Sequence, residues 1–123
     1  MSDAGTQQII GALPEGRLRR VTAYIESNLH RELRLADLSA VTYMSPYHFA
    51  RLFKRATGVS PHRFVLQRRI DAATALLADS SYSIKSIART VGFTTASHFA
   101  TTFRRMIGVT PTVYRMRTSS RLS

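Results

Sequence analysis

The chain contains an internal repeat, and this repeat constrains its fold more than any other feature of the sequence. Residues 45–61 align with residues 95–111 at an offset of about fifty positions, and residues 35–44 align with residues 84–93 further upstream. Each copy has the length of a helix-turn-helix unit, which is too short to bury a secure core alone. The sequence therefore predicts two small helical units that share the segment between them. The identical pairs are His48 and His98, Phe49 and Phe99, Ala50 and Ala100, Phe53 and Phe103, Arg55 and Arg105, Gly58 and Gly108, Val59 and Val109, and Pro61 and Pro111.

Start and stop signals for helices occur at matching places in the two copies. Ser45-Pro46, Ser60-Pro61 and Thr110-Pro111 each predict a helix start, because the hydroxyl caps free amides and proline fits the first turn. Gly58 and Gly108 precede two of these starts and supply the left-handed residue that ends a helix. These signals divide the repeat into helices of moderate length.

The predicted fold class is all-α, with two helix-turn-helix subdomains joined by a long linker helix and about seven helices in total. No segment shows the alternating pattern of a strand. The expected helices cover residues 15–31, 35–42, 46–57, 61–79, 84–91, 94 or 95 to 107, and 111–116. Within the second of these, Leu35, Leu38 and Val41 are expected to be buried. The expected domains are a flexible tail or linker remnant at 1–13, an N-terminal helix-turn-helix subdomain at 14–60, the linker helix at 61–79, a C-terminal helix-turn-helix subdomain at 80–117, and a flexible tail at 118–123.

The charge balance indicates a polyanionic partner. The formal net charge is +11, and no acidic residue follows Asp79. Nucleic acid is the first interpretation and an anionic membrane surface the second. No apolar run approaches the roughly 20 residues needed to span a bilayer. The N-terminus does not resemble a secretory signal, so we expect a cytoplasmic protein.

Nothing in the sequence suggests an enzyme, a cofactor or a metal site. The chain has no cysteine, which excludes disulfides, thiolate catalysis and Cys-ligated zinc. It has no glycine-rich phosphate loop and no paired carboxylates near a histidine, and its four histidines lack ligand spacing.

The helix expected after Ser45 has an outer face suited to DNA. Phe49 and Phe53 lie on its inner side, which places Tyr47, Ala50 and Arg51 outside. A helix fits the major groove, which is about 12 Å wide, and Arg51 can bond bidentately to guanine there. A solvated basic face is the alternative interpretation.

The second copy differs, because Thr101 stands where the first has Arg51. Small outer residues approach thymine methyl groups but offer few bidentate hydrogen bonds. We therefore expect the first unit to read sequence and the second to add anchoring and shape readout. Phosphate contacts are expected from Ser45, His48, Lys54 and Arg55 in the first unit and from Arg89, His98, Arg104 and Arg105 in the second.

Two further features leave alternatives open. Arg63, Arg68 and Arg69 on the linker helix either touch the DNA backbone, pair with Asp71 or are solvated. Tyr43 occupies the turn position that Gly92 fills in the second copy. Either the first turn has a different shape, or Tyr43 has a positive φ at a steric cost of order 1 kcal/mol.

Several motifs closely resemble the signature of the AraC/XylS family. They are Arg69-Ile70-x-x-Ala73-x-x-Leu76-Leu77, Ser83-Ile84-x-x-Ile87-Ala88-x-x-Val91-Gly92-Phe93, Ser97-His98-Phe99, and Gly108-Val109-x-Pro111-x-x-Tyr114-Arg115. The resemblance covers about residues 15–117. It implies a monomeric DNA-binding unit that spans two adjacent major grooves on one face of the duplex. It also implies base contacts by Tyr47, Ala50 and Arg51 in the first unit and by Ala96, Ser97 and Thr101 in the second.

The resemblance also bears on partners. The family commonly has an arginine at Thr101 and a glycine at Tyr43, and the first departure weakens the expected base readout by the second unit. Contact with RNA polymerase is implied by the resemblance alone. Dimerisation is expected only through a domain that is absent from this chain. The chain itself is either a stand-alone regulator or the excised DNA-binding part of a longer protein. A helix-turn-helix module that binds only proteins is the alternative function, and RNA is disfavoured because its A-form major groove is too narrow.

Overall fold

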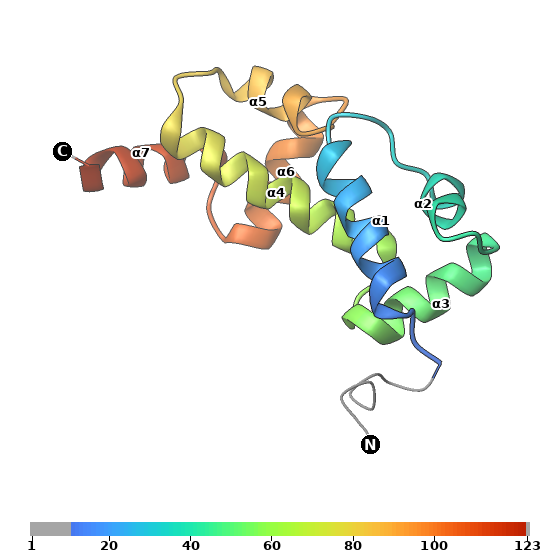
Figure 1. The fold of residues 1–123 in the computed structure, drawn as a ribbon. Coiled ribbons are helices and arrows are strands. Elements are labelled where there is room, and N and C mark those ends of the chain that lie inside the picture. The colour runs from blue at the N-terminus through green and yellow to red at the C-terminus, as the bar shows by residue number, and fades with distance from the viewer. Residues whose placement is uncertain (1–10, 123) are drawn as a thin grey trace. The chain divides into compact units, whose positions relative to one another are not determined.

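The computed structural model describes residues 11–122 and contains seven α-helices over that range (Figure 1). No strand occurs in the described part of the chain, so the predicted all-α class is confirmed. The described residues divide into two compact units, one formed by residues 11–28 together with 33–65, and the other by residues 29–32 together with 66–122. The helices are α1 (Glu15–Ser27), α2 (Leu35–Val41), α3 (Pro46–Thr57), α4 (Pro61–Asp79), α5 (Ile84–Thr90), α6 (Ala96–Ile107) and α7 (Pro111–Leu122).

The predicted helix boundaries around α3 and α6 are confirmed in atomic detail. Ser45 Oγ accepts the His48 amide at 3.3 Å, and Thr95 Oγ1 accepts the His98 amide at 3.0 Å. Both helices end in a left-handed glycine, with φ of 86° at Gly58 and 99° at Gly108. Local capping chemistry therefore fixes where both helices begin and end.

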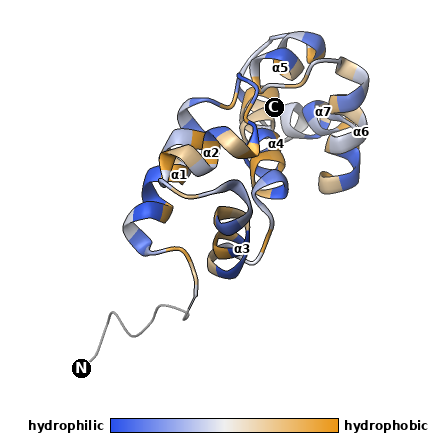
Figure 2. Cartoon of the chain, turned by 90° about the vertical axis from the view of Figure 1, so that its right-hand side faces the viewer, coloured by the Kyte–Doolittle hydropathy of each residue, from blue (hydrophilic) through white to orange (hydrophobic). Residues whose placement is uncertain are grey.

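The first unit packs α1, α2 and α3 around the start of α4. Phe49 and Phe53 are fully buried on one side of α3, and Phe53 meets Phe64 of α4 edge to face at 5.2 Å between ring centroids. Leu13 lies in this core as well, and its amide donates to the Leu52 carbonyl oxygen at 3.2 Å. In Figure 2, α3 carries hydrophobic residues on one side and hydrophilic residues on the other.

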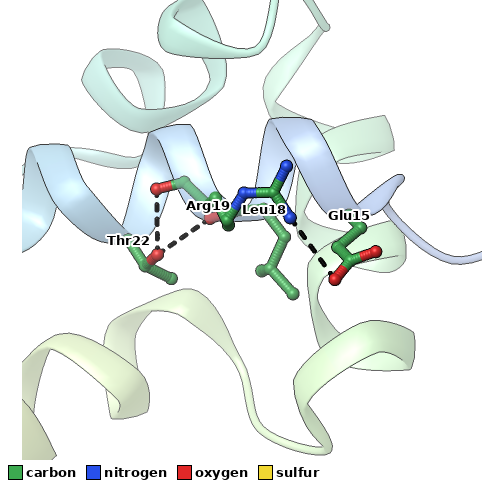
Figure 3. Close-up of polar contacts among 4 residues, drawn as sticks. All are labelled: Glu15, Leu18, Arg19 and Thr22. Atoms are coloured by element: carbon green, nitrogen blue, oxygen red, sulfur yellow. Dashed lines mark hydrogen bonds and ion pairs between the residues drawn. The ribbon is translucent and has the colours of Figure 1, made fainter.

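Several side chains of α1 make polar contacts within the helix (Figure 3). Arg19 pairs with Glu15 one turn earlier at 3.3 Å, with both side chains largely exposed. Thr22 Oγ1 donates to the carbonyl oxygens of Leu18 at 2.9 Å and Arg19 at 3.1 Å. An exposed pair of this kind adds little stability, so burial of Val21 and Ile25 is what holds α1 in the unit.

The second unit repeats this packing with α4 in the place of α1. Phe99 and Phe103 are fully buried on α6, and Phe103 meets Tyr114 of α7 edge to face at 5.7 Å. The Phe103–Tyr114 contact corresponds, fifty positions later, to Phe53–Phe64 in the first unit. The other buried residues of this core are Ile70, Ala73, Leu77, Ile87, Ala88, Val91 and Phe93.

Two expected helix ends are wrong. Helix α1 ends at Ser27 rather than near residue 31, and Asn28 follows it with a side-chain amide that donates to the Tyr24 carbonyl oxygen at 2.8 Å. Helix α7 continues to Leu122 rather than to Met116, because no glycine or proline follows Met116 to stop it.

Two expectations about burial also need correction. Leu35 is 41% exposed, since it stands at the first position of α2. Val41 is half-buried, and of the three residues expected in this helix only Leu38 is fully buried, together with Thr42. The tail expected at 1–13 lies largely outside the described residues, but Leu13 is 3% exposed and belongs to the core.

The turn before α3 contains the single non-glycine residue with positive φ in residues 11–122. Tyr43 has a φ of 61°, and Gly92 at the matching turn of the second unit has a φ of 98°. The two turns therefore share the left-handed conformation, which supports the strained alternative at Tyr43, at a cost of about 1 kcal/mol.

Candidate nucleic-acid interface

Helix α3 has one apolar and one polar side, as the sequence predicts. Phe49, Leu52 and Phe53 are buried, and the Phe49 and Phe53 rings lie 5.5 Å apart. The opposite side exposes Tyr47 and Arg51. Because the phenylalanines anchor the helix from within, its outer residues stand on a rigid support and are free to meet a partner.

Tyr47 and Arg51 lie together on the outer side of α3. The Arg51 guanidinium carbon lies 5.8 Å from the centroid of the Tyr47 ring, one helical turn away. This distance falls within the range of a cation–π contact, which adds about 0.5–1 kcal/mol at an exposed site. Tyr47 is 74% exposed, and its ring favours positions of the arginine close to it before any ligand binds.

The residues expected to bind phosphate in the first unit are all exposed, but they are not equally free. Ser45 caps α3 through its oxygen, so its hydroxyl hydrogen remains available as a donor. Arg55 directs one Nη1 donor to the Gly11 carbonyl oxygen at 3.4 Å, which leaves most of its five donors unused. His48 and Lys54 are exposed, with Lys54 in the last turn of α3. Ala50 is half-buried beside them.

Helix α6 shows smaller side chains at the equivalent surface. Ala96, Ser97 and Thr101 are exposed, whereas Thr102 is buried at 2% beside the two phenylalanines. Arg104 and Arg105 are exposed in its last turn. The second unit therefore offers cations at one end of the helix and a nearly uncharged surface along the rest.

Two other residues of the second unit are expected to bind phosphate, Arg89 on α5 and His98 in the first turn of α6. Arg89 is exposed in the last turn of α5. The His98 ring is exposed yet packs edge to face on Phe93 at 5.2 Å. Phe93 belongs to the core, so this contact fixes the position of His98 at the surface.

Arg69, one of the three linker-helix arginines, is neither solvated nor paired with Asp71. Its Nε donates to the Leu29 carbonyl oxygen at 3.2 Å, and its Nη2 donates to the Arg31 carbonyl oxygen at 2.7 Å. Burial lowers the pKa of Arg69 from its usual value. Arg68 follows one of the alternatives, with an exposed ion pair to Asp71 at 3.9 Å.

Arg115 has a similar structural role that the charge pattern alone did not reveal. Its Nε donates to the Leu77 carbonyl oxygen at 3.2 Å and its Nη2 to the Ser80 carbonyl oxygen at 3.2 Å. Both acceptors lie at the end of α4, where carbonyls have no partner within the helix. Arg69 and Arg115 therefore stabilise the second unit and are not counted among the cations of the surface.

The described residues contain no group of three or more His, Asp or Glu side chains placed to hold a metal ion. None of the helices in residues 11–122 combines the length and the hydropathy that a bilayer span requires.

Comparison with known proteins identifies the family. A family model described as a helix-turn-helix domain matches residues 38–117. The regulatory protein PocR of Salmonella typhimurium is 38% identical over 103 residues, which are 84% of this chain and 34% of PocR. The probable transcriptional regulator LumQ of Photobacterium leiognathi is 37% identical over 75% of this chain and 37% of LumQ. The chain thus spans about a third of the length of these two relatives.

Solved structures of helix-turn-helix DNA-binding domains are also similar to this chain. The DNA-binding domain of AdpA, crystallised in complex with a target DNA, is 32% identical with a TM-score of 0.82, over 85% of this chain and 95% of that one. An AraC-type DNA-binding domain protein from Chromobacterium violaceum is 29% identical with a TM-score of 0.80, over 85% and 93%. The chain therefore belongs to the AraC/XylS family of helix-turn-helix domains.

Proposed function

We propose that this chain is the sequence-specific DNA-binding unit of a transcriptional regulator, and that α3 and α6 enter adjacent major grooves on one face of a duplex. One observation carries the proposal: each of these helices is anchored by two buried phenylalanines and exposes its opposite side. An exposed helix on a rigid support is the element that reads a major groove in helix-turn-helix proteins. The complex of the AdpA domain with its target DNA supports this choice of partner.

In the first unit, Arg51 is assigned the main base contact. Its guanidinium bonds bidentately to guanine O6 and N7, the commonest specific contact in the major groove. Tyr47 and Ala50 contact base edges and thymine methyl groups beside it. In the second unit Ala96, Ser97 and Thr101 approach the bases without a comparable pair of hydrogen bonds, so this unit discriminates less.

Phosphate contacts fix the register of the two helices on the duplex and carry much of the affinity. The charged residues in this role are Lys54, Arg55, Arg89, Arg104 and Arg105, each exposed. Ser45, His48 and His98 add hydrogen bonds near the first turns of α3 and α6. With five cations, log K is expected to fall by about 4–5 per log unit of salt.

The function proposed is one of binding, with no reaction and no cofactor. The unit binds as a monomer, and any dimerisation requires a domain absent from this chain. Such a regulator acts on DNA in the cytoplasm and contacts RNA polymerase once bound.

Selection of bound fragments from a random duplex pool, followed by fluorescence anisotropy between about 50 and 200 mM salt, tests the proposal. We expect one selected sequence to bind far more tightly than a scrambled duplex, with the salt dependence given above. Methylation interference should then show two clusters of contacted bases about 10 base pairs apart on one face. Equal affinity for selected and scrambled duplexes would instead indicate a protein-interaction module.

The unequal roles of the two units are tested in the same assay. Arg51→Ala should relax the preference at its base pair by about 10- to 100-fold, which corresponds to one bidentate contact. Thr101→Ala should change preference by less than about threefold. Equal relaxation by both variants would show that the units share base readout.

A further inference from the structure

Tyr43, in the turn between α2 and α3, combines two features that do not stabilise the protein. Its φ of 61° is the only positive value at a non-glycine residue in the described chain. A bulky side chain rarely adopts this conformation, because its Cβ crowds the backbone. Tyr43 is also 81% exposed, so little apolar surface is buried in return. Backbone strain of this kind clusters at functional sites.

The second unit shows what a residue at this turn does when its role is structural. A Cβ on Gly92 would meet the Leu29 carbonyl oxygen and the Arg69 guanidinium, so glycine is favoured by φ and required by the lack of space. Tyr43 shares the backbone conformation but has its side chain in solvent. The first turn therefore tolerates a large side chain that the second turn excludes.

The surroundings of Tyr43 indicate what its ring meets. Tyr43 stands two residues before Ser45, a separation of at most about 7 Å along the chain, and so lies at the end of α3 from which Tyr47 projects. No acidic residue occurs between Asp37 and Asp71 in the sequence. An exposed phenol hydroxyl just before α3, in a stretch of sequence without acidic residues, suits a partner rich in hydrogen-bond acceptors and negative charge, and a DNA strand meets both conditions.

We propose that Tyr43 is an uncharged DNA-backbone contact, with its hydroxyl donating a hydrogen bond to a phosphate oxygen of the strand that borders the groove entered by α3. The inference rests on the proposed function and adds a ligand outside the two recognition helices. A neutral donor releases no counterion, so this contact adds affinity without adding to the salt dependence. The contact also reads no base, so its contribution is the same for every sequence.

The test compares Tyr43→Gly, Tyr43→Phe and Lys54→Ala with the parent chain, on selected and scrambled duplexes over a range of salt. Tyr43→Gly suits the positive φ and removes the ring, and Tyr43→Phe keeps the ring and the backbone conformation but lacks the hydroxyl. Both should weaken binding about tenfold on both duplexes, since the lost hydrogen bond is to a charged group. Both should leave the slope of log K against log salt unchanged, whereas Lys54→Ala should reduce it by about 0.9.

Thermal unfolding shows whether weaker binding of a Tyr43 variant results from loss of the fold. Tyr43→Gly should melt at the parent temperature or above, because glycine relieves the strained φ, so a loss of binding is then not a loss of fold. Parent-like binding by Tyr43→Gly overturns the inference, and parent-like binding by Tyr43→Phe alone overturns the hydroxyl contact. If the parent itself fails to prefer the selected duplex, the proposed function fails, and the inference falls with it.

Discussion

The Nε of Arg69 donates a hydrogen bond to the carbonyl oxygen of Leu29 at 3.2 Å, across a sequence separation of 40 residues. The same guanidinium donates from Nη2 to the Arg31 carbonyl oxygen at 2.7 Å. Both acceptors lie in the segment between α1 and α2 that belongs to the second unit. A planar guanidinium presents its donors in a fixed geometry. One side chain therefore donates hydrogen bonds to two carbonyl oxygens that lie outside the helices and have no helical N–H partner.

Replacement of Arg69 by lysine should therefore lower stability although the charge is kept. An ammonium on a flexible stem does not reproduce two hydrogen bonds in a fixed geometry. We expect the free energy of unfolding to fall by about 1–2 kcal/mol. This loss is smaller than that of two fully buried charged hydrogen bonds, because Arg69 is partly exposed to solvent. Urea titration measures this loss. Arg63→Lys, an exposed position on the same helix, is the control and should change stability by less than about 0.5 kcal/mol.

Gly92 offers a second test of the same cluster. In Gly92→Ala the added Cβ would clash with the Leu29 carbonyl oxygen and would lie 2.7 Å from the Nε of Arg69. The alanine would also have to adopt a φ of 98°, which is strained for any residue with a side chain. Gly108 has nearly the same φ, 99°, but a Cβ added there would meet nothing within 4 Å. Both substitutions bear the cost of a left-handed residue, about 1–2 kcal/mol, and only Gly92→Ala adds a steric clash.

The expected result is a loss of about 1–2 kcal/mol for Gly108→Ala and a clearly larger loss for Gly92→Ala, measured by thermal unfolding. Similar losses for the two variants would mean that the segment around Leu29 moves away without cost. The packing of that segment on Gly92 would then contribute nothing to stability.

Local chemistry explains which parts of the fold were predictable. Ser45, Thr95, Gly58 and Gly108 each act on their own helix end, and their effect is visible in the neighbouring residues of the sequence. The repeat also carried information, because Gly92 in one copy made a positive φ one of two alternatives for Tyr43 in the other, and the structure has that alternative. The capping signals depend on a few neighbouring residues, and the repeat is found by aligning the two halves of the sequence.

The features that were missed depend on contacts distant in sequence. Helix α1 ends early where the Leu29 and Arg31 carbonyls bond Arg69 instead of continuing the helix. Leu13 is buried because α3 passes beside it, and nothing in its own neighbourhood indicates that. For the candidate site, the exposure of Arg51 and Tyr47 followed from helical periodicity, whereas the contact of their side chains depends on rotamers that periodicity does not specify.

The contact between Tyr47 and Arg51 predicts that the tyrosine acts through the arginine as well as directly. Tyr47→Phe keeps an aromatic face under the guanidinium, so it should retain the preference for guanine at the base pair read by Arg51. Tyr47→Ala removes the face and should reduce that preference by about two- to fivefold, as expected for an exposed cation–π contact.

A double-mutant cycle separates this effect from a direct base contact by Tyr47. In an Arg51→Ala background, Tyr47→Ala should no longer alter the guanine preference, because no arginine remains to be positioned. Purely additive effects would show that the ring and the guanidinium act independently. Tyr47 would then keep only its role as a base contact.

Thr101 marks the position where the second unit lacks an arginine, and restoring one should extend base readout. Thr101 is exposed on the outer side of α6, matched to Arg51 of α3 in the repeat. Thr101→Arg should therefore create a preference for guanine at one base pair of the second half-site, with about tenfold tighter binding to a duplex that carries it. Thr112→Arg adds the same charge at an exposed position of α7, outside the proposed surface, and controls for general electrostatic attraction. Anisotropy on duplexes that differ only at the second half-site is the measurement. An equal gain on every duplex, as expected for Thr112→Arg, would show that α6 does not approach base edges at Thr101.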